Sequence, residues 1–403
     1  MQEETRRARK FEKTESDLSS LALRQTTAPS SSKFSAAGKL QDALSYFGTK
    51  NPFPRTIDRD DTVWLLDNTA YRNAKTGKWE TEYVAAMFSQ HSSCAVIDAV
   101  NLVAQQIELQ ESDDGYPTLQ ERLMPFIQDI RPGTTVRVLH GGQSPLIKLG
   151  PSGRNGISAD IKQIPDSTNG HITTTFAKVP KGANGILECR TFYAEPEGWG
   201  VISDVDDTIK VTQTSDPIGI LRSTFVDTPQ VCPGMPELYQ RIQGIIKETS
   251  PWFYLSASPY NLYPFLRDFR QHNFPHGTII LRDSSWMSIP GLLQTLTLGT
   301  EDYKVDRMEK IHSWLPKRKM ICIGDSTQSD PEAYGEIYRK YPGWVRLILI
   351  RKVEDIAAIG IEGKNELKRF EDAFKDVPRD AWHVFHSPTE CDELIQRVVA
   401  KDP

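Results

Sequence analysis

From residue 200 onward, short apolar runs alternate with amphipathic stretches. The apolar runs have the length of buried strands and lie at residues 200–205, 252–256, 278–281, 319–323, 345–350 and 382–385. Apolar positions at helical spacing lie between them, at residues 235–247, 260–271, 305–315, 331–340, 363–374 and 390–400. This alternation predicts an α/β domain with a doubly wound parallel sheet and right-handed crossovers.

Residues 55–195 show a different pattern, in which period-two runs are separated by polar turns. The candidate strands are Thr62–Leu66, Tyr83–Phe88, Thr135–Leu139, Ile157–Ile161, His171–Phe176 and Ile186–Phe192. Two helical stretches, 95–109 and 119–130, interrupt the series. We expect a β-rich, sandwich-like α+β domain with a helical insert. No catalytic constellation stands out in its sequence, and His140 is interpreted as a strand-end residue.

The first residues have few large apolar side chains and many charged ones, so we expect residues 1–54 to be largely disordered. Leu40 to Phe47 has the pattern of a short amphipathic helix. A small basic cluster at residues 6–10 is interpreted as part of a solvated tail. The predicted division is therefore 1–54, an accessory domain at 55–195 and the α/β domain at 196–403.

Composition narrows the classes of function. The chain has 403 residues and a formal net charge of -5, which argues against a nucleic-acid binder. Its five cysteines are scattered and lack C-x-x-C spacing, which favours free thiols in a reducing compartment. No run is long and apolar enough to span a bilayer, and the charged N-terminus is not a secretory signal. We therefore expect a cytoplasmic protein.

The most informative motif is GWGVISDVDDTIK, residues 198–210. Asp204, Asp206 and Thr208 follow its apolar strand, at the edge where open α/β sheets bind ligands. An acidic turn would be the alternative, but buried carboxylates at a strand end are costly without a cation or hydrogen bonds. Aspartates at i and i+2 project to the same side, which suits a nucleophile and an acid/base in phosphate-ester hydrolysis. Mg²⁺ is the hard cation that such chemistry favours.

Two further motifs offer groups for a phosphate. The apolar strand ending at Ser256 places a hydroxyl that can bond a phosphoryl oxygen, with Ser258 as the alternative. Lys304, just before the predicted helix at 306–315, can hold a carboxylate and a phosphate together. Lys310 competes with it, but helical spacing places Lys310 on a solvated face.

A fourth motif, MICIGDSTQSD, is a second buried strand that runs into acidic residues. Asp325 would complete a Mg²⁺ site, with Asp330 as a further ligand or an orienting carboxylate. The predicted metal ligands are therefore Asp204, Asp206, Asp325 and Asp330.

In this order, the four motifs resemble those of the haloacid dehalogenase phosphatase superfamily. The segments GWGVISDVDDTIK, FYLSASPYNLYPFL and GDSTQSDPEAY are more closely similar to the fungal actin-patch type of Mg²⁺-dependent phosphatidate phosphatase. The resemblance is strong over residues 195–355. It implies that Asp204 is the nucleophile and Asp206 the acid/base, and that the later aspartates complete the Mg²⁺ site. It also implies hydrolysis of phosphatidate to diacylglycerol and phosphate through an aspartyl-phosphate.

The same resemblance implies related substrates and partners. Members tend to accept lysophosphatidate and diacylglycerol pyrophosphate, and commonly continue into a Pro-rich tail that is absent from this sequence. We expect peripheral association with a membrane surface, and protein partners in the cortical endocytic machinery. The main alternative is a phosphatase for a soluble phosphomonoester or a phosphoprotein; a non-catalytic binding module is a weaker one, because all four motifs are intact.

Two segments that could cover the site are short: one lies between Thr208 and Met235, and the second between Pro259 and Lys304. Their modest length predicts an open site. Aromatic and sulfur side chains in the second of them suit a water–lipid interface or the core: Tyr260, Tyr263, Phe265, Trp286 and Met287. Arg222, Arg282 and Lys210 are the candidates for a second phosphate contact, and the sequence does not choose among them.

Overall fold

The computed structural model describes residues 54–92, 96–214, 216–283, 300–354 and 361–401. The predicted helix at Leu40 to Phe47, the basic cluster at 6–10, Cys94, Trp286 and Met287 lie outside these ranges. The other four cysteines are buried free thiols, as the sequence predicts.

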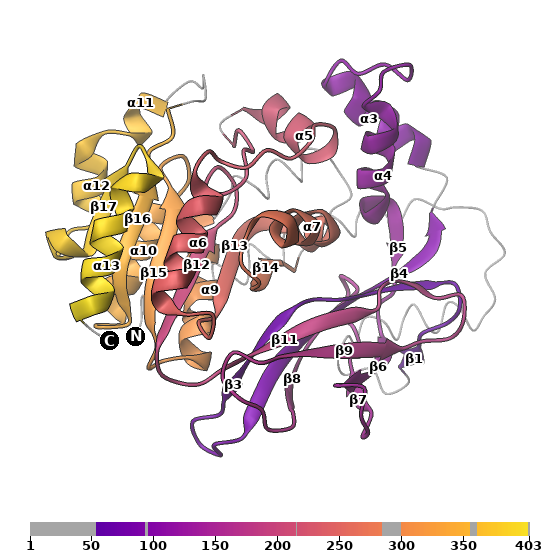
Figure 1. Ribbon diagram of the computed structural model, residues 1–403. Helices are drawn as coiled ribbons and strands as arrows, with labels where there is room; N and C mark the ends of the chain where they lie inside the picture. Colours follow the sequence, from indigo (N-terminus) through magenta and orange to yellow (C-terminus); the bar gives the residue numbers. More distant parts are fainter. Residues whose placement is uncertain (1–53, 93–95, 215, 284–299, 355–360, 402–403) are drawn as a thin grey trace, which may run out of the picture.

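The N-terminal part of the described chain is β-rich, as predicted (Figure 1). Its strands are β1 (Arg55–Thr56), β2 (Asp61–Leu65), β3 (Asn68–Arg72), β4 (Trp79–Ser92), β5 (Gln128–Ile130), β6 (Thr134–His140), β7 (Ile147–Leu149), β8 (Ile157–Gln163), β9 (Ile172–Lys178), β10 (Asn184–Ile186) and β11 (Glu188–Ala194). They form one mostly antiparallel sheet in the order β1-β6-β9-β11-β3-β4-β2-β10, with β5 and β8 also paired to β4, and β7 to β6. Met87 of β4 and Val138 of β6 share a core although their strands lie apart in this order, so the sheet curls around its own apolar face.

Two helices interrupt this sheet, α3 (Val96–Gln106) and α4 (Tyr116–Ile127). The helix predicted at 119–130 is wrong at both ends. It begins earlier, and residues 128–130 form β5, because Ile130 pairs with Phe88 across the sheet. Strand β3 was not predicted, because its buried residues include Asn68 and Thr69, whose polar side chains are typical of a turn.

The second sheet is wholly parallel, with the order β14-β13-β12-β15-β16-β17. Its strands are β12 (Trp199–Asp204), β13 (Trp252–Pro259), β14 (Thr278–Arg282), β15 (Lys319–Asp325), β16 (Val345–Arg351) and β17 (Trp382–Phe385). All six predicted strands are confirmed within a few residues. These strands could be predicted from the sequence because a strand buried on both faces is apolar along its whole length.

Helices cover both faces of this sheet (Figure 1). They are α5 (Pro217–Phe225), α6 (Met235–Ile246), η2 (Tyr260–Leu262), α7 (Tyr263–Asn273), α9 (Thr300–Trp314), α10 (Asp330–Lys340), α11 (Ile361–Lys364), α12 (Leu367–Ala373), η3 (Arg379–Ala381), η4 (Pro388–Cys391) and α13 (Asp392–Lys401). Successive residues of β12 point to opposite cores: Val201 packs with α6 and α7, and Ile202 with α9 and α10. The predicted α/β class with a parallel sheet is therefore confirmed.

The helix predicted at 363–374 is divided into α11 and α12, and two further differences concern α9 and α5. The helix predicted at 305–315 begins at Thr300, where Glu301 and Asp302 in the first turn suit the positive end of the helix dipole. Lys304 consequently lies inside α9 and not before it. Helix α5 was not predicted. Asp216 caps it by accepting hydrogen bonds from the backbone N–H groups of Ile218 and Gly219.

A buried interface joins the two sheets. Asp67, which follows β2, accepts a 2.8 Å hydrogen bond from Arg270 of α7, and its backbone N–H donates to the Tyr263 hydroxyl. Tyr71 stacks on Trp314, and Phe88 on Tyr260. Within the described ranges, every helix is too short or too polar to span a bilayer.

Candidate active site

The candidate residues meet at the carboxyl edge of the parallel sheet. Asp204 ends β12 and is paired with Leu255 of β13, so Ser256 follows at the same level. On the other side of β12, Asp325 ends β15. Neighbouring parallel strands end at the same edge, and for this reason residues more than 100 positions apart come together.

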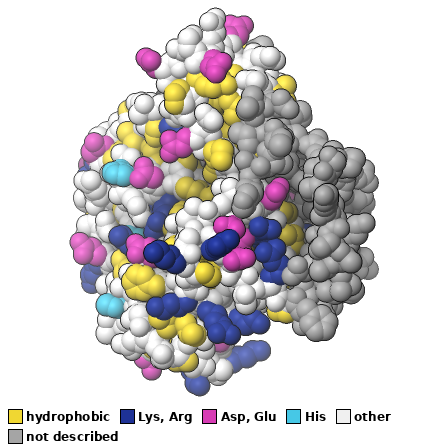
Figure 2. Space-filling view, turned by 90° about the vertical axis from the view of Figure 1, so that its right-hand side faces the viewer, with side chains coloured by type: hydrophobic (Ala, Val, Ile, Leu, Met, Phe, Trp, Pro, Cys, Tyr) yellow, Lys and Arg dark blue, Asp and Glu magenta, His cyan; other side chains and the backbone are white. Residues whose placement is uncertain are grey.

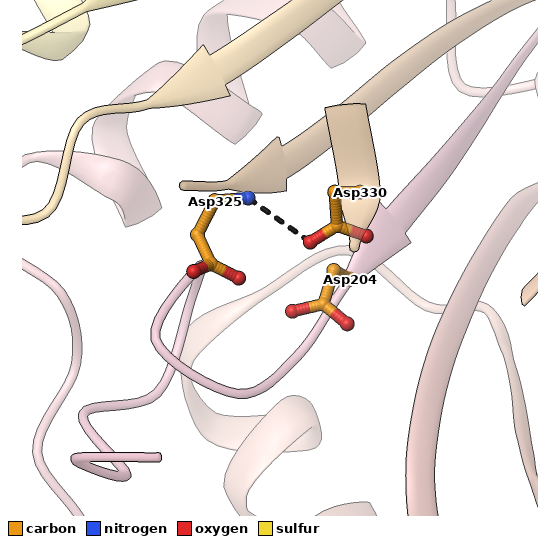
Figure 3. A group of neighbouring side chains, drawn as sticks. All are labelled: Asp204, Asp325 and Asp330. Atoms are coloured by element: carbon orange, nitrogen blue, oxygen red, sulfur yellow. Dashed lines mark hydrogen bonds between the residues drawn. The ribbon is translucent and has the colours of Figure 1, made fainter. Parts of the chain in front are cut away.

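Three carboxylates form the centre of the site. Asp204, Asp325 and Asp330 are all buried, and each offers an oxygen within 4.8 Å of the others (Figure 3). Asp330 is the first residue of α10, and its Oδ2 accepts a 3.1 Å hydrogen bond from the Asp325 backbone N–H. Gly324 allows this approach, because a Cβ at that position would lie 2.6 Å from the Asp330 side chain.

Lys304 supplies the positive charge at this centre. Its ammonium is fully buried and lies 2.8 Å from Asp204 Oδ1 and 2.5 Å from Asp330 Oδ1. Three ionised carboxylates and one ammonium leave two negative charges uncompensated. An all-oxygen donor set with that residual charge suits a hard divalent cation such as Mg²⁺.

Burial and mutual repulsion set the protonation of these groups. Burial, followed by the charge of Asp330, raises the pKa of Asp325 to about 8. The same two causes raise the pKa of Asp204 well above its usual value, and Lys304 opposes the rise. Burial disfavours the charged form of Lys304, but Asp204 and Asp330 outweigh it, so its pKa is raised. A bound cation would favour the ionised forms of Asp204 and Asp325, because it would offset this repulsion.

Asp206 lies beside this centre in a separate set of hydrogen bonds. Its Oδ2 accepts from Ser256 Oγ at 2.7 Å, and its Oδ1 from Thr212 Oγ1 at 2.8 Å. The carboxylate of Asp206 is not one of the three grouped oxygens, although the sequence placed it among the metal ligands. These two hydrogen bonds hold the carboxylate in one orientation.

Thr208 and Asp207 shape the loop between these groups. Thr208 Oγ1 donates to Asp204 Oδ2 at 3.1 Å. Asp207 has a positive φ of 60°, and its carboxylate accepts from the backbone N–H groups of Thr212, Gln213 and Thr214 at 2.7–2.8 Å. The third aspartate of the motif thus organises the loop that follows it.

Contacts that sequence reasoning missed tie the loops together. Gln328 donates to the Asp206 carbonyl, Thr214 bonds Thr327, and Arg351 donates to the Asp207 carbonyl. Thr212 was missed as well. The only signal available was the presence of polar residues near the strand ends, which does not single out any of these five residues.

The alternatives left open by the sequence separate clearly. Lys310 pairs with Glu82 across the interface and stays away from the three-carboxylate centre, whereas Lys304 reaches it. The Ser258 backbone N–H donates to Ser256 Oγ, so Ser256 is the serine that contacts Asp206.

The three candidates for a second phosphate contact differ in position. Arg222 donates to the Ile107 carbonyl and lies 3.7 Å from Asp227. Arg282 is buried against the Tyr303 ring. Lys210 is buried too, and its ammonium donates to Thr212 Oγ1 at 3.1 Å. Lys210 is thereby linked to the site, through Thr212 and Asp206.

The aromatic side chains near the site are mainly core residues. Tyr260 and Tyr263 are buried, while Phe265 is half-buried beneath Arg122. For the two tyrosines, the interfacial interpretation is therefore wrong: they fill the interface between the sheets. The hydroxyl of each bonds the backbone of the β-rich part, at Asn155 and Asp67 respectively.

Comparisons with known proteins match the region of this site. Residues 199–352, from the first residue of β12 to just beyond β16, match the family model for the catalytic domain of phosphatidate phosphatase APP1. Phosphatidate phosphatase APP1 of Saccharomyces cerevisiae is 30% identical over 277 residues, which is 64% of this chain and 45% of that protein. Uncharacterized protein C29B5.04c of Schizosaccharomyces pombe is 28% identical over 170 residues, 39% of this chain and 25% of that protein.

The chain spans less than half the length of either relative. Among solved structures, a GH2 beta-galacturonidase from Eisenbergiella tayi matches with 8% sequence identity and a TM-score of 0.26. The match covers 81% of this chain and 55% of the galacturonidase chain. That score is too low to bear on fold or function. Residues 199–352, which hold this site, are therefore similar to the catalytic domain of phosphatidate phosphatase APP1, and the identity to the yeast enzyme is in keeping with that likeness.

Proposed function

We propose that this protein is a Mg²⁺-dependent phosphatidate phosphatase that works through an aspartyl-phosphate. The observation that carries the proposal is the convergence of Asp204, Asp325, Asp330 and Lys304 inside the segment that matches the APP1 catalytic family. The parallel sheet with this acidic edge supports a haloacid dehalogenase-like fold for residues 196–403. Residues 55–195 would then be an accessory domain.

Asp204 is the proposed nucleophile. A carboxylate oxygen attacks phosphorus, and the bond from phosphorus to the glycerol oxygen breaks. Asp206 passes its proton to the departing diacylglycerol oxygen. Asp206 then takes a proton from water, whose oxygen attacks the phosphoryl group; the bond to Asp204 breaks and phosphate leaves.

The remaining residues hold these groups in place. Lys304 compensates charge on Asp204 and Asp330, and would attract the phosphate oxygens. Thr208 fixes one oxygen of Asp204, and Ser256 one oxygen of Asp206. Mg²⁺, held by Asp204, Asp325 and Asp330, would supply charge neutralisation for the transferring phosphoryl group.

The substrate class can be tested directly. Phosphate release is measured from phosphatidate in detergent micelles and from the soluble ester 4-nitrophenyl phosphate, each with Mg²⁺ and with a chelator. We expect Mg²⁺-dependent release from both, with the higher kcat/KM for phosphatidate. Cleavage of the soluble ester alone would keep the chemistry, but it would replace phosphatidate by a soluble phosphomonoester or phosphoprotein. Lysophosphatidate and diacylglycerol pyrophosphate are the next lipids to compare.

A further inference from the structure

The outer face of the β-rich sheet carries a row of unpaired cations. In the strand register, Arg137 of β6 lies opposite Lys148 of β7 on one side and opposite Lys178 of β9 on the other. All three side chains are exposed. Residues directly opposite in a sheet have Cβ atoms about 5 Å apart, so three like charges stand side by side.

No carboxylate of the described chain compensates this basic row, which consists of Lys148, Arg137 and Lys178. None of the three forms an ion pair with a described residue, whereas nearby Lys162 pairs with Asp160, and Arg131 with Asp61. Glu188, opposite Phe176, is only a diagonal neighbour of Lys178. Like charges directly opposite destabilise a sheet, and a role in binding an anionic partner would account for a row that carries this cost.

Apolar side chains are exposed beside the same row. Phe176 lies opposite Leu139 and is 42% exposed, and Ile172, on the same face of β9, is 40% exposed. Leu146, two residues before Lys148, is 46% exposed. Figure 2 shows the right-hand side of the view in Figure 1, with lysine and arginine gathered over its lower part and hydrophobic and acidic side chains among them.

We propose that the basic row, together with Phe176, Ile172 and Leu146, docks the protein on a bilayer surface that contains anionic phospholipids. Cations attract the phosphate layer, and exposed aromatic and aliphatic side chains enter the headgroup region. The choice of a lipid partner rests on the proposed function, since phosphatidate is itself an anionic bilayer lipid. The buried contact between Asp67 and Arg270 joins this sheet to the catalytic region, so docking would tether the catalytic region to the same membrane.

The test uses the whole chain and sedimentation with vesicles. One set is phosphatidylcholine alone, and the other also contains phosphatidylserine, which is not a phosphomonoester and therefore not a substrate. The test variant is the triple Arg137→Gln, Lys148→Gln, Lys178→Gln. The matched control removes the same charge from exposed lysines elsewhere: Lys75→Gln, Lys78→Gln, Lys317→Gln.

We expect the wild type to bind the anionic vesicles selectively, and less tightly as salt is raised. At about fivefold per cation, the test variant should lose on the order of 100-fold in affinity and the control much less. Equal loss in both triples would overturn the proposal, and so would no selective binding by the wild type, which would leave an acidic protein as the partner of this face. Activity on 4-nitrophenyl phosphate should be unchanged in the test variant. Selective binding without phosphatidate hydrolysis would support docking through the basic row and would contradict the proposed function instead.

Discussion

At the scale of single residues, Thr212 shows how much of a site can lie outside its motifs. Its hydroxyl holds Asp206 Oδ1 and also receives a hydrogen bond from the buried Lys210. Burial lowers the pKa of Lys210, while Asp206 and Asp207 oppose that shift. Thr212 would therefore be a positioning residue for the proposed acid/base.

Replacing Thr212 by Val should lower kcat on phosphatidate by about 10- to 100-fold, because a misoriented general acid loses part of its contribution. The loss should be smaller with 4-nitrophenyl phosphate, whose leaving group needs little protonation. Thr212→Ser keeps the hydroxyl and should restore most of the rate. An equal loss on both substrates in Thr212→Val, without rescue by Ser, would show a merely structural role.

Lys304 is predicted to be essential for stability when no metal is present. Lys304→Met leaves three buried carboxylates without their cation, which should cost about 3–5 kcal/mol of the free energy of unfolding. The matched control is Lys340→Met, whose partly exposed pair with Glu309 joins the same two helices and should cost about 1 kcal/mol or less. Urea unfolding in chelator measures both, and similar losses would contradict this account of the three-carboxylate centre.

The raised pKa of Asp325 predicts how stability changes with pH. The unfolded carboxyl titrates near 3.8 and the folded one at about 8, so the metal-free folded state binds more protons between these values. Stability of the metal-free protein should therefore fall as pH rises from about 4 to about 8. Mg²⁺ competes with those protons, so its stabilising effect should grow over the same window. Thermal unfolding with and without Mg²⁺ at pH 5 and pH 8 checks the sign, and a larger Mg²⁺ effect at pH 5 would contradict it.

At the scale of elements, the contact of Asp67 with α7 fixes the β-rich sheet to the catalytic region. Asp67 accepts from Arg270 and from the Arg190 backbone N–H, and lies 3.5 Å from Arg267, with no exposure of its side chain. Arg72 and Glu195 form a second ion pair, whose side chains are partly exposed, and this pair serves for comparison.

Asp67→Ala should cost about 3–5 kcal/mol in the free energy of unfolding, because Arg270 is left buried without its partner. Glu195→Gln removes a half-exposed ion pair and should cost at most about 1 kcal/mol. Denaturant unfolding compares them. Equal effects would mean that the Asp67 contact does not hold the two sheets together.

At the scale of the whole molecule, the parallel sheet was predictable and its surroundings were less so. Strands buried on both faces can be recognised in the sequence as apolar runs. The order of the sheet brings their carboxyl ends together at Asp204 and Asp325. The position of Lys304 inside α9 was not predictable, because helix ends depend on capping that several residues can supply. Strand β3 was hidden because Asn68 and Thr69 are buried through hydrogen bonds and not through hydrophobicity.

The site followed the same rule. Asp204 and Asp325 lie at strand ends and could be found. Thr212, Gln328 and Arg351 act through loop geometry that no spacing in the sequence encodes. The basic row could not be predicted from the sequence for a related reason. Arg137, Lys148 and Lys178 are scattered in sequence and become neighbours only through the strand register.

The most direct test of the central claim is the rate of phosphate release from phosphatidate in detergent micelles with Mg²⁺, compared between the wild type and Asp204→Asn. The matched control is Asp268→Asn, at an exposed aspartate on α7. We expect a loss of at least about 10³-fold for Asp204→Asn and none for Asp268→Asn, with both variants folded. Mg²⁺-dependent release that survives in Asp204→Asn would contradict the assignment of Asp204 as the nucleophile.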